Sequence, residues 1–376
     1  MYTYKELDLI DTNDRHFFYF EDKITPLKLE LEKLVQSLDY MHNKEFADKV
    51  LFPYEVKFNN AAETYNDDVS LINETINNKD IATTEKEKRI LNLYNGYKYI
   101  LRNNMAINKE NLRHLYTILS NGLINDYDRV NMGEYYRNGR NTITSPYLDK
   151  PDIECFDYKK LSKYMDILFN FINTNNDFEL LTDYYIKSQI IHFYFVYLHP
   201  YFDINGRTSR TTSMWYLLNN KAYPYIIFNR CVMLHRNKYC IAIEDAIKYR
   251  NLTFFINYMQ QRVIEELEKE YLIDSINSSN NNLSTTDIQT LQYIISFNGP
   301  KNVNHFAYMY NNYNEKRTKK EILETMINPL IEKDILKIIR TTNKNIYGNK
   351  PNFIFDINYN NIDIDKEKVK HLSLDI

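Results

Sequence analysis

The sequence is poor in the residues that interrupt regular structure and in those that crosslink a chain. Glycine occurs 7 times and proline 9 times among 376 residues. So few turn-forming residues, together with long segments of helical periodicity, predict a mainly α fold. Three cysteines, Cys155, Cys231 and Cys240, are too few for a disulfide framework and lack metal-site spacing. We expect them to be buried free thiols in a reducing cytoplasm.

Long apolar runs and an excess of one charge are also missing. No run reaches about 18 apolar residues, so we expect no membrane span. The first residues, MYTYKELDLIDTND, are acidic and lack the pattern of a secretory signal. A net charge of -3 provides no global attraction to nucleic acid or to a membrane. These absences favour a cytoplasmic globular protein.

The periodic segments divide the chain into regions. We expect an N-terminal region at 1–85 that is irregular and then helical, a helical core at 86–272, a Ser/Asn-rich linker at 273–287, a compact domain at 288–358 and a charged tail at 359–376. Thr-Thr-Glu at 83–85 and Asn108 predict helix N-caps. Two glycines, two prolines and the β-favouring TIT predict a short hairpin within 131–153.

Three helices and then two strands, the pattern of 288–358, are the outline of a winged helix. Its third helix begins with basic residues that acidic ones dilute: Lys316, Arg317, Lys319 and Lys320 against Glu315, Glu321, Glu324 and Glu332. Winged helices read DNA with such a helix, but a strong basic face is absent. DNA binding and a role in protein interaction or dimerisation both stay open.

One polar cluster, HPYFDINGRTSR at 199–210, directly follows the apolar run QIIHFYFVYL. His199 at the end of that helix titrates near neutral pH and suits a general base. Asn205 and Gly206 suit a tight turn, and the helix that follows presents free N–H groups at its start. Such a helix start binds anions.

The same cluster carries two arginines and an acid. Arg207 and Arg210 lie three residues apart on one helical face, which suggests a polyphosphate rather than a single carboxylate. Asp203 is a hard oxygen ligand suited to Mg²⁺ on those phosphates. Each residue alone is ordinary for a cap or a solvated face. Together they predict a site for a polyphosphate and its metal ion.

The segment resembles the signature of the Fic family, His-Pro-Phe-x-Asp-Gly-Asn-Gly-Arg-x-x-Arg. It matches at seven positions: His199, Pro200, Asp203, Asn205, Gly206, Arg207 and Arg210. Tyr201 replaces the usual Phe, which adds a hydroxyl that needs a partner. Ile204 replaces the usual Gly. The resemblance covers roughly 60–270 and implies a mainly α Fic-type core with a β-hairpin flap, here followed by a C-terminal winged helix.

The resemblance implies AMP transfer from ATP to a Tyr, Thr or Ser hydroxyl of a protein. In that reading His199 deprotonates the hydroxyl and Asp203 binds Mg²⁺. The phosphates are bound by Asn205, Gly206, Arg207 and Arg210, and Tyr239 lies on a helix similar to the family's nucleotide-binding one. Members that transfer phosphate carry Lys in place of Gly206. The flap near 133–145 would dock the target by strand addition, and the chain itself or a second copy is a candidate partner.

Two further alternatives follow from the same resemblance. The protein could remove AMP from a target, or it could be a nucleotide-sensing, DNA-binding regulator with weakened catalysis. Ile204 bears on the second alternative. If its position requires a positive φ, a β-branched residue costs about 1–3 kcal/mol there; at an ordinary φ it adds only bulk near the α-phosphate.

An inhibitory helix is the last expectation. Many Fic proteins resemble one another in Ser/Thr-x-x-x-Glu-Gly/Asn, and SLINET at 70–75 fits this pattern at Ser70 and Glu74. We expect this helix at about 62–78. Glu74 would pair with Arg210 and occupy the guanidinium that should bind the γ-phosphate.

Overall fold

The chain divides into two compact units, Met1–Val263 and Ile264–Ile376. The computed structural model describes residues 3–46, 51–63, 65, 69–77, 83–103, 105–144, 152–174, 178–234, 236–280, 283–296, 301–313, 316–341 and 353–372. The fold is mainly α, as the sequence predicted. Among the described residues no helix is both long and apolar enough to cross a membrane.

The first unit opens with a β-hairpin, where the sequence had suggested irregular structure. Strand β1 (Tyr4–Ile10) pairs antiparallel with β2 (His16–Phe20). Leu7, Leu9 and Phe17 are buried, so alternate residues of the two strands face the core. The buried residues alternate with charged ones over only a few positions. This pattern is too short to have been identified as a pair of strands from the sequence.

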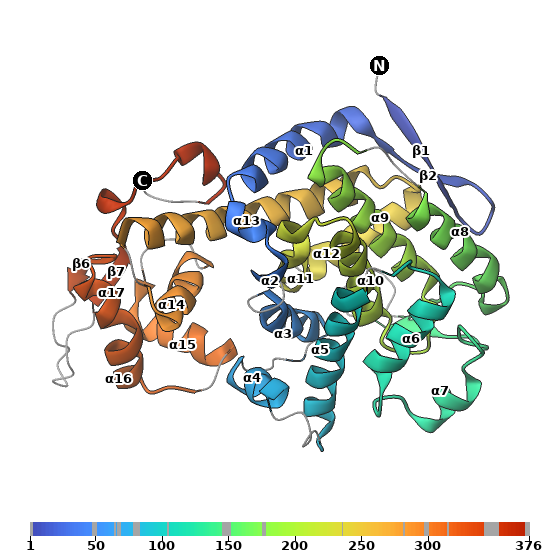
Figure 1. Ribbon diagram of the computed structural model, residues 1–376, viewed down its shortest axis with the longest axis horizontal. Coiled ribbons are helices and arrows are strands. Elements are labelled where there is room, and N and C mark those ends of the chain that lie inside the picture. The colour runs from blue at the N-terminus through green and yellow to red at the C-terminus, as the bar shows by residue number, and fades with distance from the viewer. Residues whose placement is uncertain are drawn as a thin grey trace. The chain divides into compact units, whose positions relative to one another are not determined.

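Helices make up most of the rest of this unit (Figure 1). They are α1 (Glu21–Gln36), η1 (Asp39–His42), α2 (Lys44–Phe46), α3 (Phe52–Ala62), α4 (Val69–Asn77), α5 (Glu85–Asn103), α6 (Lys109–Ser120), α7 (Asp126–Asn131), η4 (Tyr158–Lys160), α8 (Leu161–Asn173), α9 (Leu181–Leu198), α10 (Asn205–Asn219), η5 (Tyr223–Ile227), α11 (Phe228–Leu234) and α12 (Arg236–Tyr249). Both predicted caps are confirmed. Thr84 and Glu87 exchange cap hydrogen bonds at the start of α5, and Asn108 accepts from the N–H of Asn111 at the start of α6.

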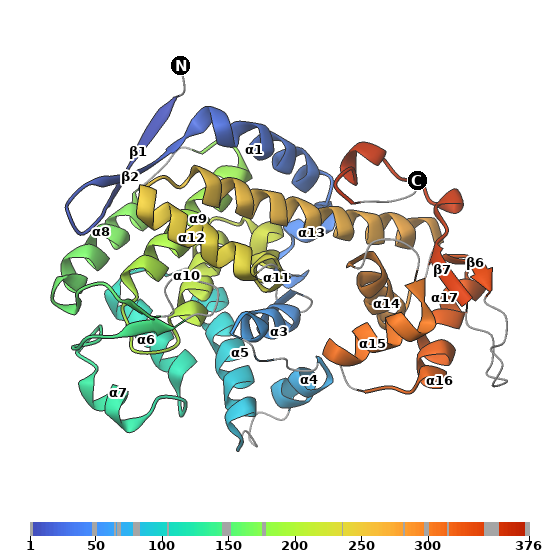
Figure 2. The ribbon, with the colours of Figure 1, turned by 180° about the vertical axis from the view of Figure 1, so that it is seen from behind.

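Helices α9 and α10 lie side by side at the centre of this unit (Figures 1 and 2). Phe193, Phe195 and Leu198 on α9 and Met214 and Trp215 on α10 are fully buried. A helix that is buried on nearly all sides is held rigidly by its neighbours. The polar segment that joins these two helices therefore has a fixed support at both ends.

The predicted hairpin between α7 and α8 is present. Strand β3 (Thr142–Thr144) pairs antiparallel with β4 (Asp152–Glu154), with Ile143 opposite Ile153. Residues 145–151, which join them, lie outside the described residues.

The boundary between the units corrects two sequence predictions. It falls inside one helix, α13 (Thr253–Asn280), so most of the predicted linker at 273–287 is helical. Ile273 and Ile276 are buried on one face of that helix, which gives the Ser- and Asn-rich stretch a reason to stay folded. The predicted division at residue 85 is also absent, because the N-terminal region and the core form one unit.

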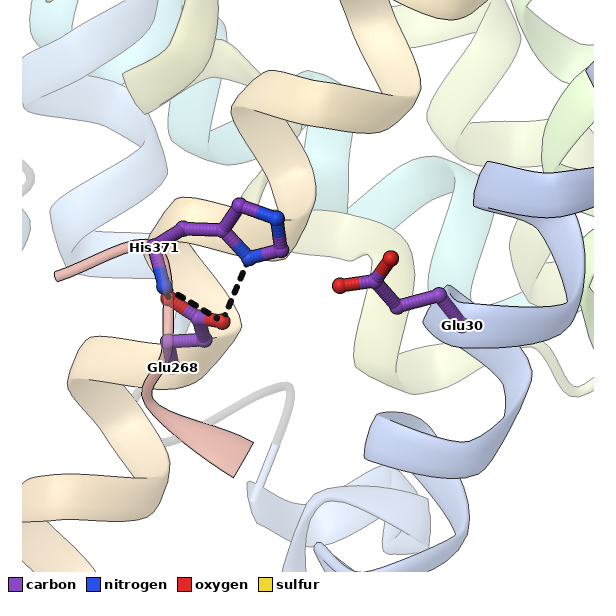
Figure 3. Close-up of side chains that lie close together, drawn as sticks. All are labelled: Glu30, Glu268 and His371. Atoms are coloured by element: carbon purple, nitrogen blue, oxygen red, sulfur yellow. Dashed lines mark hydrogen bonds and ion pairs between the residues drawn. The ribbon is translucent and has the colours of Figure 1, made fainter. Parts of the chain in front are cut away.

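The second unit continues with three helical segments and a small sheet. Its elements are α14 (Thr285–Ser296), β5 (Lys301–Asn302), α15 (Val303–Tyr313), α16 (Lys319–Ile322), a π-helical turn (Leu323–Ile327), α17 (Asn328–Glu332), β6 (Leu336–Thr341), β7 (Phe353–Ile357), η7 (Tyr359–Asn361) and η8 (Lys366–Lys368). The strands form an antiparallel sheet in the order β5-β7-β6. His371 near the end of the chain donates its backbone N–H to the Glu268 carboxylate, and its Nδ1 lies 2.8 Å from Glu268 Oε1 (Figure 3).

Candidate functional site

His199 ends helix α9 in a left-handed backbone conformation, with φ 48° and ψ 60°. Its backbone N–H still donates to the Phe195 carbonyl, so the residue is tied to the helix while its carbonyl turns away. Burial, and then the charge of Arg137, lowers the pKa of His199 to about 4, against the opposing charge of Glu63. The imidazole is therefore neutral at neutral pH and can accept a proton.

The turn from Tyr201 to Asn205 is closed by side-chain hydrogen bonds. The Asn205 amide accepts from the Tyr201 N–H and donates to the Tyr201 carbonyl, at 2.9 and 2.8 Å. Asp203 Oδ1 accepts from the N–H of Ile204 at 2.6 Å. Because both polar atoms of the Asn205 side chain close the turn, its contribution to an anion site comes from its backbone.

Ile204 has φ 64° and ψ 13°, so the position does require a positive φ. Only glycine adopts this region without steric cost. The Ile204 side chain is 3% exposed, and its carbonyl accepts from both the N–H and the hydroxyl of Thr208. The substitution thus leaves the turn in the left-handed conformation rather than abolishing it.

Tyr201 is fully buried and stacks on Tyr116, with ring centroids 3.7 Å apart and planes 13° apart. Its hydroxyl has no hydrogen-bond partner among the described residues. The Tyr201 ring is therefore held by stacking, and its hydroxyl, which Phe would lack, makes no hydrogen bond with the described residues.

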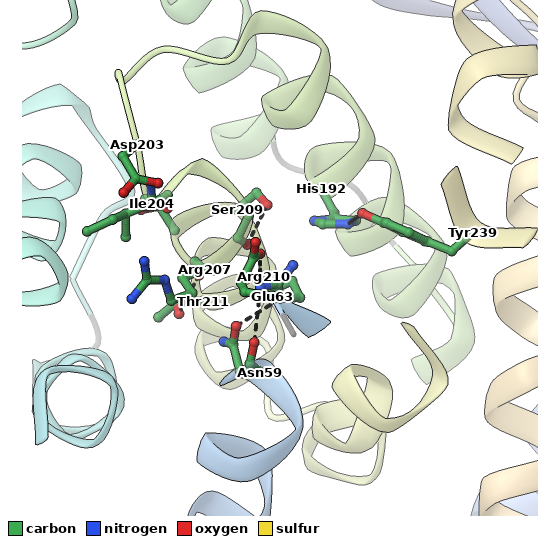
Figure 4. A network of polar contacts seen from close by, with 12 residues as sticks. Asn59, Glu63, His192, Asp203, Ile204, Arg207, Ser209, Arg210, Thr211 and Tyr239 are labelled. Carbon is green, nitrogen blue, oxygen red and sulfur yellow. Dashed lines mark hydrogen bonds and ion pairs between the residues drawn. The ribbon is translucent and has the colours of Figure 1, made fainter. Parts of the chain in front are cut away.

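Helix α10 begins directly after this turn, so the N–H groups of Asn205, Gly206 and Arg207 have no partner within the helix. The Arg207 side chain is 5% exposed, yet its Nε and Nη1 have no hydrogen-bond partner among the described residues. Figure 4 draws this guanidinium apart from the dashed contacts around Arg210. A buried guanidinium with unused donors beside a helix start is suited to an anionic ligand.

Arg210, one turn along α10, in contrast donates hydrogen bonds from Nε and Nη2 to residues at the end of α3 (Figure 4). Its Nε donates to Asn59 Oδ1 at 2.9 Å, and its Nη2 donates to the Asn59 carbonyl at 3.2 Å and to Glu63 Oε1 at 2.6 Å. Burial raises the pKa of Glu63, but the charges of Arg210 and Arg207 outweigh it and hold that pKa below its usual range. Glu63 is therefore an anion inside the predicted phosphate site.

Gly206 lies against the same carboxylate. A Cβ atom added to Gly206 would overlap Glu63 Oε1 and approach Arg210 Nη1 to 3.0 Å. A larger residue here would require the ends of the Glu63 and Arg210 side chains to shift.

The pairing of Glu74 with Arg210 is wrong, because Glu63 occupies that guanidinium. Glu74 lies on α4 with an exposed side chain. The side chain of Ser70, its partner in the predicted motif, lies outside what the structure describes. The same four-residue spacing occurs one helix earlier, where Asn59 and Glu63 both contact Arg210.

Tyr239 on α12 is nearly buried and reaches back to α9. Its hydroxyl lies 2.5 Å from Nε2 of His192, and the two rings lie 5.8 Å apart at 26° (Figure 4). Burial lowers the pKa of His192 to about 3, so this imidazole is neutral. Burial also raises the pKa of Tyr239, with Arg210 and Glu63 among the charges that act on it, which places Tyr239 near the same site.

Asp203 is the residue best suited to a divalent cation. Its side chain is exposed, and among the described residues its one hydrogen bond is from the N–H of Ile204 to Oδ1. One carboxylate oxygen thus remains for a hard cation next to Arg207, whose pKa feels the charge of Asp203. The donor set fits Mg²⁺ bound together with phosphate oxygens rather than by the protein alone.

Sequence reasoning missed four residues of this site: Asn59, Glu63, Arg137 and His192. Asn59 and Glu63 share the spacing of the inhibitory motif, but a search for Ser or Thr at the first position excludes them. Arg137, in the segment before β3 that resembles the flap, and His192, on α9, were not assigned to the site because their contacts with it are not local in sequence.

Comparisons with known proteins agree with the geometry. Residues 106–217 match the family model described as Fic/DOC family. No curated protein matches the chain. The crystal structure of a Fic family protein from Desulfovibrio desulfuricans G20 is similar over 89% of this chain and 96% of its own, with 14% identity and a TM-score of 0.53.

Two more solved structures are similar at lower scores. A Fic domain containing signaling protein from Bacteroides thetaiotaomicron VPI-5482 is similar over 66% of this chain and 95% of its own, with 15% identity and a TM-score of 0.47. A Fic-1 fragment from C. elegans is similar over 66% of this chain and 72% of its own, with 13% identity and a TM-score of 0.46. Of these three structures, the one from Desulfovibrio has a TM-score above 0.5 and shows a shared fold.

Proposed function

Because residues 106–217 form a Fic/DOC family domain, we propose that the chain is a protein adenylyltransferase, which transfers AMP from ATP to a hydroxyl group of a protein. The observation that carries the proposal is the buried Arg207 guanidinium with unused donors, at the start of α10 and a short turn after His199. A polyphosphate would satisfy these donors together with the free N–H groups of the first turn.

In the proposed reaction His199 accepts the proton of the target hydroxyl. The hydroxyl oxygen forms a bond to the α-phosphorus of ATP, the bond from that phosphorus to the bridging oxygen breaks, and pyrophosphate leaves with the electron pair. Arg207 and the helix start would stabilise charge on the phosphates, and Tyr239, bonded to His192, is the residue that we expect to contact the nucleotide. Asp203 would hold Mg²⁺, which neutralises phosphate charge when bound.

Gly206 supports AMP transfer over phosphate transfer. Relatives of the phosphate-transferring kind carry Lys there, whereas Gly206 lets the Glu63 carboxylate lie directly against the start of α10. The target would dock at the hairpin of β3 and β4, whose strands are short and available for strand addition.

Inhibition is the second part of the proposal, and it rests on Glu63. The Glu63 carboxylate occupies the Arg210 guanidinium that would bind the γ-phosphate, so ATP would bind in an unproductive way. The chain as folded would then be a restrained enzyme that becomes active when the end of α3 moves.

The test compares two labels on ATP in the Glu63→Gly chain. With Mg²⁺ and a mixture of cellular proteins, we expect label to be incorporated from ATP labelled at the α-phosphate and not at the γ-phosphate. Incorporation of γ-label instead would show phosphate transfer and would overturn the proposal. Loss of α-label incorporation in the same chain with His199→Ala is the control for its own active site.

A further inference from the structure

Arg137 connects the β3–β4 hairpin to the turn that carries His199, although nothing in the proposed reaction assigns it a role. We propose that Arg137 is a positioning residue, which fixes the backbone of His199 and keeps its imidazole available as the proton acceptor. The inference rests on the proposed function, since it concerns the base of that reaction.

The contacts of Arg137 reach three separate segments. Its backbone N–H donates to the Pro200 carbonyl at 2.9 Å, and its Nε donates to the His199 carbonyl at 2.9 Å. Its Nη1 donates to the Gly139 carbonyl at 2.7 Å, and its Nη2 donates to the Phe156 carbonyl. The side chain is 2% exposed, so no water competes with these bonds.

These bonds act on the strained part of the turn. His199 has a positive φ, which a residue with a side chain adopts only when its surroundings hold it there. The left-handed conformation directs the His199 carbonyl away from α9. Arg137 Nε stabilises this orientation by donating a hydrogen bond to that carbonyl. Arg137 and the Phe195 carbonyl thus hold His199 from two sides.

The same guanidinium places a positive charge beside the imidazole. The charged groups that act on His199 are Arg137, from the segment before β3, and Glu63, from the end of α3. Burial is the largest cause of the low His199 pKa of about 4; Arg137 lowers it further by disfavouring the imidazolium, and Glu63 opposes this. Arg137 therefore helps to keep His199 in the form that accepts a proton.

Arg137 also links His199, the proton acceptor, to the β3–β4 hairpin. Gly139 lies just before β3 and Phe156 just after β4, so the guanidinium closes the base of the hairpin while it binds the His199 turn. A target strand added to the hairpin would then be held in a fixed relation to the proton acceptor.

The experiment uses the full chain with Glu63→Gly, so that transfer is measurable. Arg137→Gln removes the charge, Arg137→Lys retains it but loses the forked geometry, and Arg129→Gln on the exposed surface of α7 is the matched control. The readouts are the pH dependence of AMP transfer and the titration of the His199 ring protons by NMR, assigned with His199→Ala.

For Arg137→Gln we expect the His199 pKa to move upward, toward the ordinary value of about 6.5. The apparent pKa on the acid side of the pH profile for AMP transfer should shift upward together with the His199 pKa. Arg137→Lys should leave the titration low but reduce kcat at least tenfold with little change in KM for ATP, which separates positioning from nucleotide binding.

Unchanged titration in Arg137→Gln, or unchanged kcat in Arg137→Lys, would overturn the proposal. If Arg137→Gln does not fold, the kcat of Arg137→Lys decides it. The NMR titration needs no transfer reaction. A chain that shows the shift but transfers no AMP at any pH would therefore contradict the proposed function and leave the role of Arg137 intact.

Discussion

At the scale of single residues, Ile204 is where the chain departs from its own signature. A left-handed backbone costs a residue with a side chain about 1–2 kcal/mol. Burial of an isoleucine side chain contributes about 1.5–3 kcal/mol, and this one is 3% exposed. The burial offsets a strain of similar size, and the left-handed turn and the helix start that follows it persist with Ile204 in place.

This balance predicts an unusual order of stabilities at position 204. Ile204→Ala and Ile204→Gly both lose the buried side chain, but only Ala keeps the cost of a positive φ. We expect Gly to be more stable than Ala by about 0.5–1 kcal/mol, measured by urea unfolding followed through Trp215, the single tryptophan. At Thr117, exposed in the middle of α6, the same pair should show the opposite order. The same order of stability for the Ala and Gly variants at both positions would contradict the account.

At the scale of elements, α3 is the part that we propose restrains the site. Asn59 in its last turn and Glu63 just after its end both bind Arg210. Earlier on the same helix, Glu55 is buried with one carboxylate oxygen 3.7 Å from Arg230 Nε on α11. The helix is thus anchored at more than one point, and its release requires the break of buried charge contacts.

The comparison of two glutamates tests which helix inhibits. Glu63→Gly should raise self-modification with labelled ATP by tenfold or more, because it frees the Arg210 guanidinium for the γ-phosphate. Glu74→Gly removes an exposed carboxylate from α4 and should leave incorporation unchanged. A larger rise in Glu74→Gly than in Glu63→Gly would return the inhibitory role to the predicted helix.

The contrast between α3 and α4 also shows how far sequence reasoning reached. Local sequence was sufficient to predict the helix caps and to identify Ile204 as the position where a positive φ would matter, because caps and turns depend on neighbouring residues. The contact that we propose is inhibitory joins Glu63 and Arg210, which are 147 positions apart, so no local pattern specifies it. Asn59 stands where the motif has Ser or Thr, and the motif therefore favoured Ser70 and Glu74.

At the scale of the whole molecule, the two units have different relations to the proposed function. The residues of the candidate site all lie in Met1–Val263. In the second unit, Lys316, Lys319 and Lys320 are exposed, but Glu321 and Glu324 lie on the same short helical stretch. With a net charge of -3, the chain has no overall electrostatic attraction for DNA. Binding of a partner protein therefore remains an alternative to DNA binding as the role of this unit.

The most direct test of the central claim is the intact mass of the whole chain after incubation with ATP and Mg²⁺. We expect the Glu63→Gly chain to gain the mass of an AMP group, the unsubstituted chain to gain little, and Glu63→Gly with His199→Ala to gain none. The same gain with and without His199 would contradict transfer through this site. A gain equal to one phosphate group would contradict AMP as the transferred group.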